Sequence, residues 1–161
     1  MANLIEQAKA KADELLQQAY HSAAEKDILP KDAEFRGNVD IPKDTKNGDY
    51  AANHAMVSAK AMKKAPRQIA EALVVELNLE GSWFEGVEIA GPGFINFRLS
   101  QKWYGDVLAD VEKEGDDFGS CDVGHGEKVM VEFVSANPTG PMTIGNARGG
   151  VLGDTLASVL Q

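Results

Sequence analysis

Apolar residues recur at helical spacing in several stretches of the chain, and each stretch predicts an amphipathic helix. At the start, Asn3 and Glu6 have the spacing of an N-cap residue and its reciprocal partner. Pro66 suits the first turn of a later helix. Proline has no backbone N–H, and an N–H in the first turn would have no partner within the helix. The predicted helices cover residues 4–19, 50–64, 66–77, 101–112 and 144–160.

Between the helices the period shortens to that of strands. A short strand is predicted at residues 35–41, and Gly91-Pro-Gly93 predicts a turn between two strands within residues 87–99. In the second of these strands one face is apolar, with Ile95, Phe97 and Leu99. The opposite face carries an aromatic ring, an amide and a cation, supplied by Phe94, Asn96 and Arg98. These three groups can stack on, hydrogen-bond to and neutralise one splayed nucleotide, although a plain solvent-facing strand has the same spacing.

The C-terminal part has a different pattern. Residues 114–127 are rich in Gly and Asp and predict a linker, whereas residues 128–134 are a continuous apolar run of the kind buried in parallel sheets. A loop rich in Gly and Pro and an apolar helix follow. The expected fold class is α+β, in which a small domain with an antiparallel sheet and packed helices (1–113) precedes the linker (114–127). The first strand, loop and helix of a truncated Rossmann-like α/β domain then occupy residues 128–161.

Composition favours a folded protein without an export signal. The chain has 161 residues, 43% of them hydrophobic, and its N-terminus is charged where a signal peptide is apolar. No run is long enough to span a bilayer, so no membrane association is expected and a cytosolic location is predicted. Cys121 is the only cysteine, which excludes an internal disulfide and a cysteine-rich zinc site. His21, His54 and His125 lack metal-ligand spacing, so no metal site is predicted and these residues are expected in surface or capping roles.

Charge is unevenly distributed. The net charge of −9 disfavours binding to nucleic acid, but residues 43–67 hold six basic and two acidic residues, a local excess of +4. The six basic residues are Lys43, Lys46, Lys60, Lys63, Lys64 and Arg67. Such a stretch is either an RNA-facing surface or a solvated helix face, and charge alone favours the solvated face.

The loop near the C-terminus carries the most specific pattern. A helix that starts just after a strand offers unbonded N–H groups to phosphates, and glycines at 140 and 145 let a ligand approach the backbone. The full string from Val131 to Asp154 resembles the signature of arginyl-tRNA synthetases, in which a Glu-Phe-x-Ser-x-Asn-Pro segment leads into the HIGH motif of class I enzymes. Upstream, Gly48-Asp-Tyr-Ala-Ala-Asn-His-Ala-Met, Pro66-Arg-Gln-Ile-Ala and Ala90-Gly-Pro-Gly-Phe-Ile-Asn-Phe resemble the N-terminal additional domain of that family.

The resemblance implies a role for each matching residue. Glu132, Ser135 and Asn137 match positions that line the arginine pocket of the family, and Phe94, Asn96 and Arg98 fall where its additional domain reads the D-loop of tRNA. The implied ATP-binding residues are Pro138, Thr139, Gly140, Gly145 and Asn146. Thr143 and Asn146 stand at the two histidine positions of the HIGH motif and are the implied catalytic residues. Asn is an accepted substitute at the second of these positions, whereas Thr at the first departs from the family pattern.

The resemblance also implies the reaction of the parent protein. It would activate arginine with ATP and Mg²⁺ as substrates, with no tightly bound cofactor, and transfer the arginine to tRNA(Arg). Residues 1–161 lack the second class I signature and the anticodon-binding domain, so the chain is expected to be an inactive N-terminal piece that at most binds tRNA. The alternative is a stand-alone RNA-binding module without ligase chemistry. Exposed apolar residues in the truncated catalytic segment also predict self-association.

Overall fold

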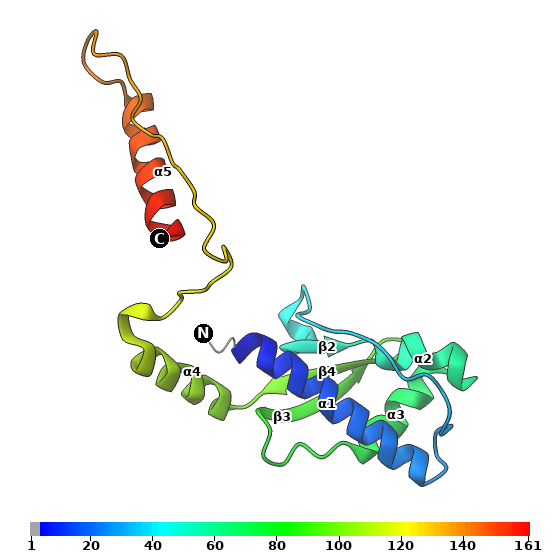
Figure 1. The fold of residues 1–161 in the computed structure, drawn as a ribbon. Coiled ribbons are helices and arrows are strands. Elements are labelled where there is room, and N and C mark those ends of the chain that lie inside the picture. The colour runs from blue at the N-terminus through cyan, green and yellow to red at the C-terminus, as the bar shows by residue number, and fades with distance from the viewer. Residues whose placement is uncertain (1–3) are drawn as a thin grey trace. The chain divides into compact units, whose positions relative to one another are not determined.

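The computed structural model describes residues 4–161, so the predicted N-cap at Asn3 lies outside the described residues. The chain divides into two compact units, Met1–Phe118 and Gly119–Gln161. Most helices and all strands belong to the first unit (Figure 1).

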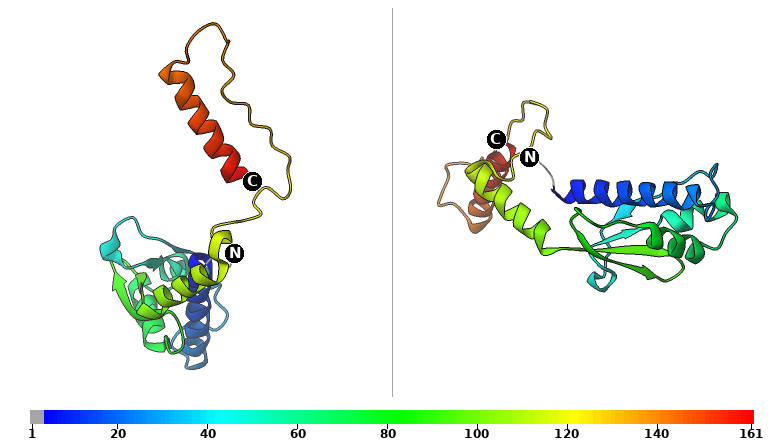
Figure 2. Two further views of the ribbon diagram at one scale, coloured as in Figure 1. Left: turned by 90° about the vertical axis from the view of Figure 1, so that its left-hand side faces the viewer. Right: turned by 90° about the horizontal axis from the view of Figure 1, so that it is seen from below.

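The helices of the first unit follow the predicted apolar stripes. α1 (Leu4–Glu25) buries one alanine- and leucine-rich side and extends beyond the predicted end to include Tyr20. The Tyr20 hydroxyl donates hydrogen bonds of 2.7 and 2.9 Å to the carbonyl oxygens of Pro30 and Ala33, which ties the following loop to the helix. α3 (Pro66–Glu76) starts at the predicted proline and buries Ile69, Ala70 and Leu73. α1 and α3 contact each other and the sheet, forming a helical layer over one of its faces (Figure 2).

The sheet has four strands in the order β1-β2-β4-β3, and all neighbouring strands are antiparallel. The strands are β1 (Val39–Asp40), β2 (Tyr50–Ala52), β3 (Phe84–Ala90) and β4 (Phe94–Leu99). Ile95 and Phe97 of the central strand β4 are fully buried in the core beneath the helices. The predicted α+β class and antiparallel sheet are therefore correct, and the strand predicted at residues 35–41 is limited to the two residues of β1.

The predicted helix at residues 50–64 begins too early. Residues Tyr50–Ala52 form β2, and the helix α2 covers only His54–Met62. Ala51 pairs with Asn96 of β4 and with Asp40 of β1, so pairing on both sides outweighs the helix preference of alanine. Tyr50 also gains burial in the strand, because only 2% of its surface stays exposed.

Two glycines allow loops to approach the sheet closely. Gly48 follows the short helix η1 (Thr45–Asn47) with φ +83°, and a Cβ there would lie 2.7 Å from the Phe97 carbonyl oxygen. Gly93 has φ +143°, and its Cβ would lie 2.9 Å from the carbonyl carbon of Pro66. The first contact fixes the loop after β1 on β4, and the second presses the β3–β4 turn against the start of α3.

The first unit ends with α4 (Gln101–Glu114) and a short helix η2 (Gly115–Asp117). In the second unit α5 (Ile144–Leu160) forms as predicted. The predicted strand at residues 128–134 is absent, and these residues have no regular secondary structure. A strand needs a neighbour to bond its N–H and C=O groups, and no strand is present among the described residues of this unit. The expected strand-loop-helix start of an α/β domain is therefore represented only by its loop and helix.

Candidate functional site

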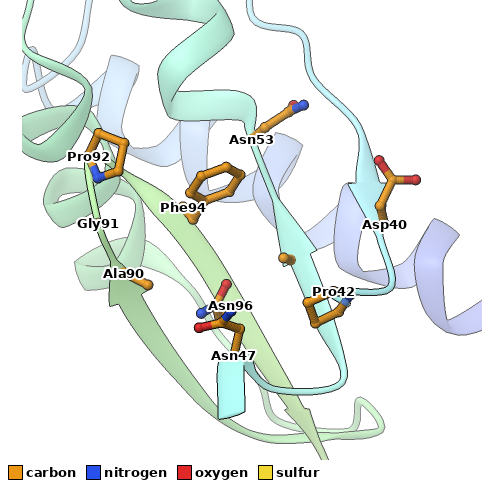
Figure 3. A pocket seen from close by; sticks show the side chains of 10 residues that line it. Asp40, Pro42, Asn47, Asn53, Ala90, Gly91, Pro92, Phe94 and Asn96 are labelled. Atoms are coloured by element: carbon orange, nitrogen blue, oxygen red, sulfur yellow. The ribbon is translucent and has the colours of Figure 1, made fainter. Parts of the chain in front are cut away.

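The clearest cavity of the first unit is a cleft of about 440 Å³ on the sheet face opposite the helices (Figure 3). It is lined by Asp40, Pro42, Asn47, Ala51, Asn53, Ala90, Gly91, Pro92, Phe94 and Asn96. Three of these residues carry amides, one carries a carboxylate, and none is a cation. The cleft therefore offers hydrogen bonds and apolar surface rather than a phosphate-binding charge.

Strand register brings the lining residues together. Asp40 pairs with Ala51, and Ala51 pairs with Asn96, so the three lie in one row across β1, β2 and β4. Ala90 pairs with Phe94 one step along the same face. The end of the cleft away from Gly91 and Pro92 is polar, since Asn47 and Asn96 both line it there (Figure 3).

The loop that carries Asn47 is fixed at both ends. Asp44 caps η1 by accepting a 3.0 Å hydrogen bond from the Lys46 N–H. The Asp49 N–H donates to the Phe97 carbonyl at 2.9 Å, and the Leu99 N–H donates to the Asp49 carboxylate at 2.7 Å. The position of Asn47 at the cleft edge is thus set by β4 itself.

The three predicted tRNA-binding residues lie on the face that alternation indicated, but they differ in exposure. Phe94 is 38% exposed, and Arg98 is exposed near the end of the strand. Asn96 differs from the expectation of an open, solvent-facing position, because only 4% of its surface is exposed. β4 is a central strand, so its neighbours β2 and β3 cover Asn96 from both sides.

Asn96 is also polar and unsatisfied. Its buried Oδ1 has no hydrogen-bond partner within the described residues. An unpaired buried polar atom costs about 1–3 kcal/mol, so a native structure that keeps one usually has a use for it. Because Asn96 lines the cleft, a ligand with an N–H or O–H donor is the partner that the geometry suits.

Arg98 extends beyond the cleft toward a neighbouring loop. Its Nη2 donates a 3.3 Å hydrogen bond to the Lys46 carbonyl and lies 3.9 Å from a Glu88 carboxylate oxygen. Both side chains of this ion pair are half exposed or more, so solvent screens the pair. Arg98 thus places its guanidinium near the loop that carries Asn47, with the exposed Glu88 carboxylate beside it.

His54 has neither the surface nor the capping role expected from the sequence, because it is buried and the N-cap of α2 is Asn53. It is fully buried at the start of α2, and its Nε2 lies 2.8 Å from an Asp13 carboxylate oxygen. Burial lowers the pKa of His54 below 6.5 and outweighs the opposing effect of Asp13. The exposed histidines His21 and His125 do match the surface prediction. No periodic signal marked His54, because it begins a helix whose alanine-rich sequence has little amphipathic pattern.

In the second unit the residues predicted to line an arginine pocket form a local pair. The Ser135 hydroxyl donates a short hydrogen bond to the Glu132 carboxylate. Between them Val134 has φ +58°, a backbone conformation that β-branched residues rarely adopt. The third residue, Asn137, directly precedes the bend at residues 138–141, and its carbonyl accepts a 2.8 Å bond from the Thr139 N–H.

Thr143 and Asn146, predicted as catalytic, form a capping box at the start of α5. The Asn146 side chain accepts a 3.0 Å bond from the Thr143 N–H, while the Thr143 hydroxyl accepts a 3.3 Å bond from the Asn146 N–H. The threonine that departs from the family pattern is therefore an effective helix N-cap. Among the described residues, no hydrogen bond joins this pair to Glu132 or Ser135.

The predicted ATP-binding residues surround that helix start. Pro138, Thr139 and Gly140 are exposed in the loop before it, and Gly145 is in its first turn. A Cβ at Gly145 would meet only the Thr143 hydroxyl, at 3.6 Å, and a Cβ at Gly140 would meet nothing. The loop is thus open to a ligand on the side of these glycines.

No group of three or more His, Cys, Asp or Glu side chains that could hold a metal ion occurs within residues 4–161. Over the same range, no helix combines the length and the apolar character needed to cross a bilayer.

Comparison with known proteins places this geometry in a family. A family model described as the arginyl tRNA synthetase N terminal domain matches residues 5–99. Arginine–tRNA ligases of Acetivibrio thermocellus and Caldanaerobacter subterraneus subsp. tengcongensis are each 46% identical over all 161 residues of this chain. Those 161 residues cover 28% and 29% of the two relatives.

Further matches agree. An arginine–tRNA ligase of Symbiobacterium thermophilum is 50% identical over 123 residues, which are 76% of this chain and 22% of the relative. A solved arginyl-tRNA synthetase from Plasmodium falciparum shares the fold over 92% of this chain and 27% of its own, with a TM-score of 0.50 and 18% identity. The chain therefore spans less than a third of the length of these relatives.

Proposed function

Because this chain belongs to the arginyl-tRNA synthetase family, we propose that its first unit binds the elbow of tRNA(Arg) through the cleft around Phe94 and Asn96. In this proposal a base from the D-loop enters the cleft, Phe94 stacks on it, and Asn96 accepts a hydrogen bond from it. The buried, unpartnered Oδ1 of Asn96 is the observation that carries the proposal.

The composition of the cleft supports a base rather than a phosphate as the occupant. Aromatic and proline surfaces suit the flat face of a base, and amides suit its polar edge. Arg98, next along the strand, would then contact the sugar–phosphate backbone rather than the base. If the cleft binds the base and Arg98 binds the backbone, the lining needs no cation although the RNA is a polyanion.

A tRNA titration tests the proposal. The full chain is mixed with an arginine tRNA transcript, and affinity is measured for the wild type, Phe94→Ala and Asn96→Ala. Loss of a stacking residue costs about 1–3 kcal/mol, which corresponds to roughly a fivefold to a hundredfold weaker affinity. Phe94→Ala is the cleaner variant, because its ring is already partly exposed and its loss leaves the core intact.

Thermal unfolding of each variant provides the folding control. The outcome that contradicts the proposal is unchanged affinity in both variants with unchanged unfolding temperatures. A stand-alone RNA-binding module would give the same titration result. The length of the source gene distinguishes such a module from a piece of a ligase, because only a ligase gene would encode the remaining length found in the relatives.

For the parent protein we propose arginine–tRNA ligase activity in a cytoplasmic location. The arginine carboxylate attacks the α-phosphate of ATP and releases pyrophosphate, and a terminal hydroxyl of tRNA(Arg) then attacks the arginyl-adenylate and releases AMP. Mg²⁺ would arrive as part of the ATP substrate, since this ion is usually held by phosphates together with one or two carboxylates. Glu132, Ser135 and Asn137 are proposed to bind arginine, and residues 138–140 with Gly145 and Asn146 to bind ATP.

Thr143 and Asn146 are proposed as catalytic residues. The capping box that they form holds both at the start of α5. Residues 1–161 alone are expected to show no detectable aminoacylation of tRNA(Arg) with arginine and ATP, because the loop occupies the surface of a unit without a sheet. The assay needs a preparation free of host synthetase. Aminoacylation above a blank lacking the protein would contradict the expectation.

Self-association of the second unit is a further part of the proposal. Several apolar side chains of α5 are more than half exposed, including Ile144 at 91% and Val151 at 70%. Exposed apolar area of this kind favours contact with another copy. Sedimentation velocity over a hundredfold concentration range should show a rising weight-average mass. Val151→Asp should reduce the rise, and a concentration-independent monomer would contradict this part.

A further inference from the structure

The corner between α2 and α3 is basic, although the chain as a whole is strongly acidic. Residues 54–70 contain four basic residues and no Asp or Glu, whereas the whole chain has a net charge of −9. The four are Lys60, Lys63, Lys64 and Arg67, and all are exposed. Such a local inversion of charge is not explained by the packing of either helix.

Backbone contacts place this corner beside the cleft. Gly93 of the β3–β4 turn lies against Pro66, the first residue of α3. Arg67 Nη1 lies 3.5 Å from the carbonyl oxygen of Gly91, which is a lining residue of the cleft. The corner therefore borders the Gly91–Pro92 end of the cleft, opposite the Asn47 end where Lys46 and Arg98 are found.

The individual cations differ in how far they are already engaged. Lys64 Nζ donates to the Ile28 carbonyl at 2.7 Å, and Arg67 forms a 3.2 Å ion pair with Glu71. No hydrogen bond or ion pair of the Lys60 or Lys63 side chain occurs among the described residues. Lys63 ends α2 in a left-handed conformation, which turns the chain at the corner itself.

We infer that the α2–α3 corner, with Lys60 and Lys63 as its principal contacts, binds the sugar–phosphate backbone of the RNA on one side of the base held in the cleft. This inference rests on the proposed function. Cations at both ends of a cleft that has none in its own lining let a chain of phosphates enter at one end and leave at the other. β4 runs between the two ends, and its five steps from Phe94 to Leu99 cover roughly 17 Å at 3.4 Å per residue.

An acidic protein segment is the other ligand class that could fit four cations. The cleft favours RNA, because a base-sized apolar and amide-lined cavity adjoins the cations. Two results are therefore expected together. The affinity for RNA should fall linearly with salt concentration on logarithmic axes, as it does for nucleic-acid binding, and it should also depend on the residues of the cleft.

The test uses the full chain and the same arginine tRNA transcript at several salt concentrations. Log affinity falls as log salt rises, so the slope of this plot is negative. In the double variant Lys60→Gln with Lys63→Gln, the loss of two phosphate contacts should make the slope shallower by roughly 1.5 to 2. The control double variant, Lys102→Gln with Lys113→Gln, removes the same charge from α4. Figure 1 shows α4 and α2 at different ends of the first unit, and the control should keep the wild-type slope.

The outcomes separate this inference from the proposed function. If Phe94→Ala weakens binding but the corner variant keeps the wild-type slope, the inference is wrong and the cleft remains. If the corner variant makes the slope shallower but Phe94→Ala and Asn96→Ala have no effect, the corner binds RNA and the cleft assignment is wrong. An equally shallow slope for the α4 control, or competition by polyglutamate as effective as that by RNA, overturns the corner as an RNA contact. Absence of wild-type binding overturns both.

Discussion

The two units of the chain contain similar fractions of apolar residues but bury them very differently. In the first unit Leu16, Ile69 and Leu73 are fully buried among helices and sheet. In the second unit Leu152 of α5 is 61% exposed and Ile144 is 91% exposed. An apolar stripe therefore specifies a helix, but a core requires a second layer to cover the stripe. The first unit contains both layers within itself.

Leucine truncation in each unit should produce the largest contrast. Leu73→Ala in α3 removes a fully buried side chain, and we expect the free energy of unfolding to fall by about 2–5 kcal/mol. Leu152→Ala in α5 is the matched control and should change the main unfolding transition by less than about 0.5 kcal/mol. Urea unfolding followed by circular dichroism measures both. Equal losses in the two variants would mean that α5 contributes to the same core.

Alanine at a glycine should give the next largest difference. Gly48→Ala introduces a Cβ about 2.7 Å from the Phe97 carbonyl at a positive φ, which should destabilise the first unit by about 1–3 kcal/mol. It should also displace Asn47 and weaken tRNA binding. Gly140→Ala is the control in the second unit, because its Cβ would meet no atom within 4 Å. A Gly48 variant as stable as the wild type would contradict the close approach.

Acid should destabilise the first unit through His54. Burial holds the pKa of His54 below its ordinary 6.5, so at lower pH the unfolded chain takes up a proton that the folded chain excludes. The free energy of unfolding should therefore be unaffected by His54 above pH 6.5 and should fall as the pH decreases below it. Urea midpoints between pH 8 and pH 5 measure the effect.

The same series with His54→Gln should show a shallower fall, and His21→Gln is the exposed control. Glu76 acts in the same direction in more acidic solution, because hydrogen bonds from Lys26 and Ser22 lower its pKa below 4.5. A fall in stability between pH 6.5 and pH 5 that is identical in wild type and His54→Gln would assign the effect to other groups.

The smallest effect is expected at the start of α5. Thr143→Ala removes the N-cap side chain, which costs about 1 kcal/mol of local helix stability. Faster hydrogen exchange of the Asn146 and Ala147 amides should report it, while unfolding of the first unit stays unchanged. Thr143→Ser keeps the hydroxyl and should exchange at the wild-type rate. Equal exchange in the alanine and serine variants would show that the capping box does not hold the helix start.

Local patterns in the sequence were sufficient for the elements whose structure depends on neighbours in the chain. The start of α3 at Pro66 and the hairpin turn at Gly91–Gly93 both follow from residues with restricted or unusual backbone preferences. The stripes of α1 and α5 were likewise readable from spacing. These features need no knowledge of what lies across the fold.

The errors occurred where distant residues decide the outcome. Tyr50–Ala52 forms a strand because β1 and β4 lie on either side of it, and residues 128–134 lack regular structure because no strand lies beside them. Alternation placed Asn96 on the correct face, but its burial depends on the flanking strands and was not predictable from period alone. The cleft itself was missed, since Asp40, Asn47 and Asn53 come from separate loops and strand ends that only the tertiary structure joins.

The strand order also has a consequence for synthesis on the ribosome. β1 and β2 are made well before β4, yet β4 lies between β2 and β3 and supplies Phe94 and Asn96 to the cleft. β2 therefore cannot pair with β4 until α2 and α3 have been translated, and pairing over such a sequence separation is slow. The cleft is thus complete only when the end of β4 has left the exit tunnel, so nascent chains paused before Leu99 should not bind tRNA.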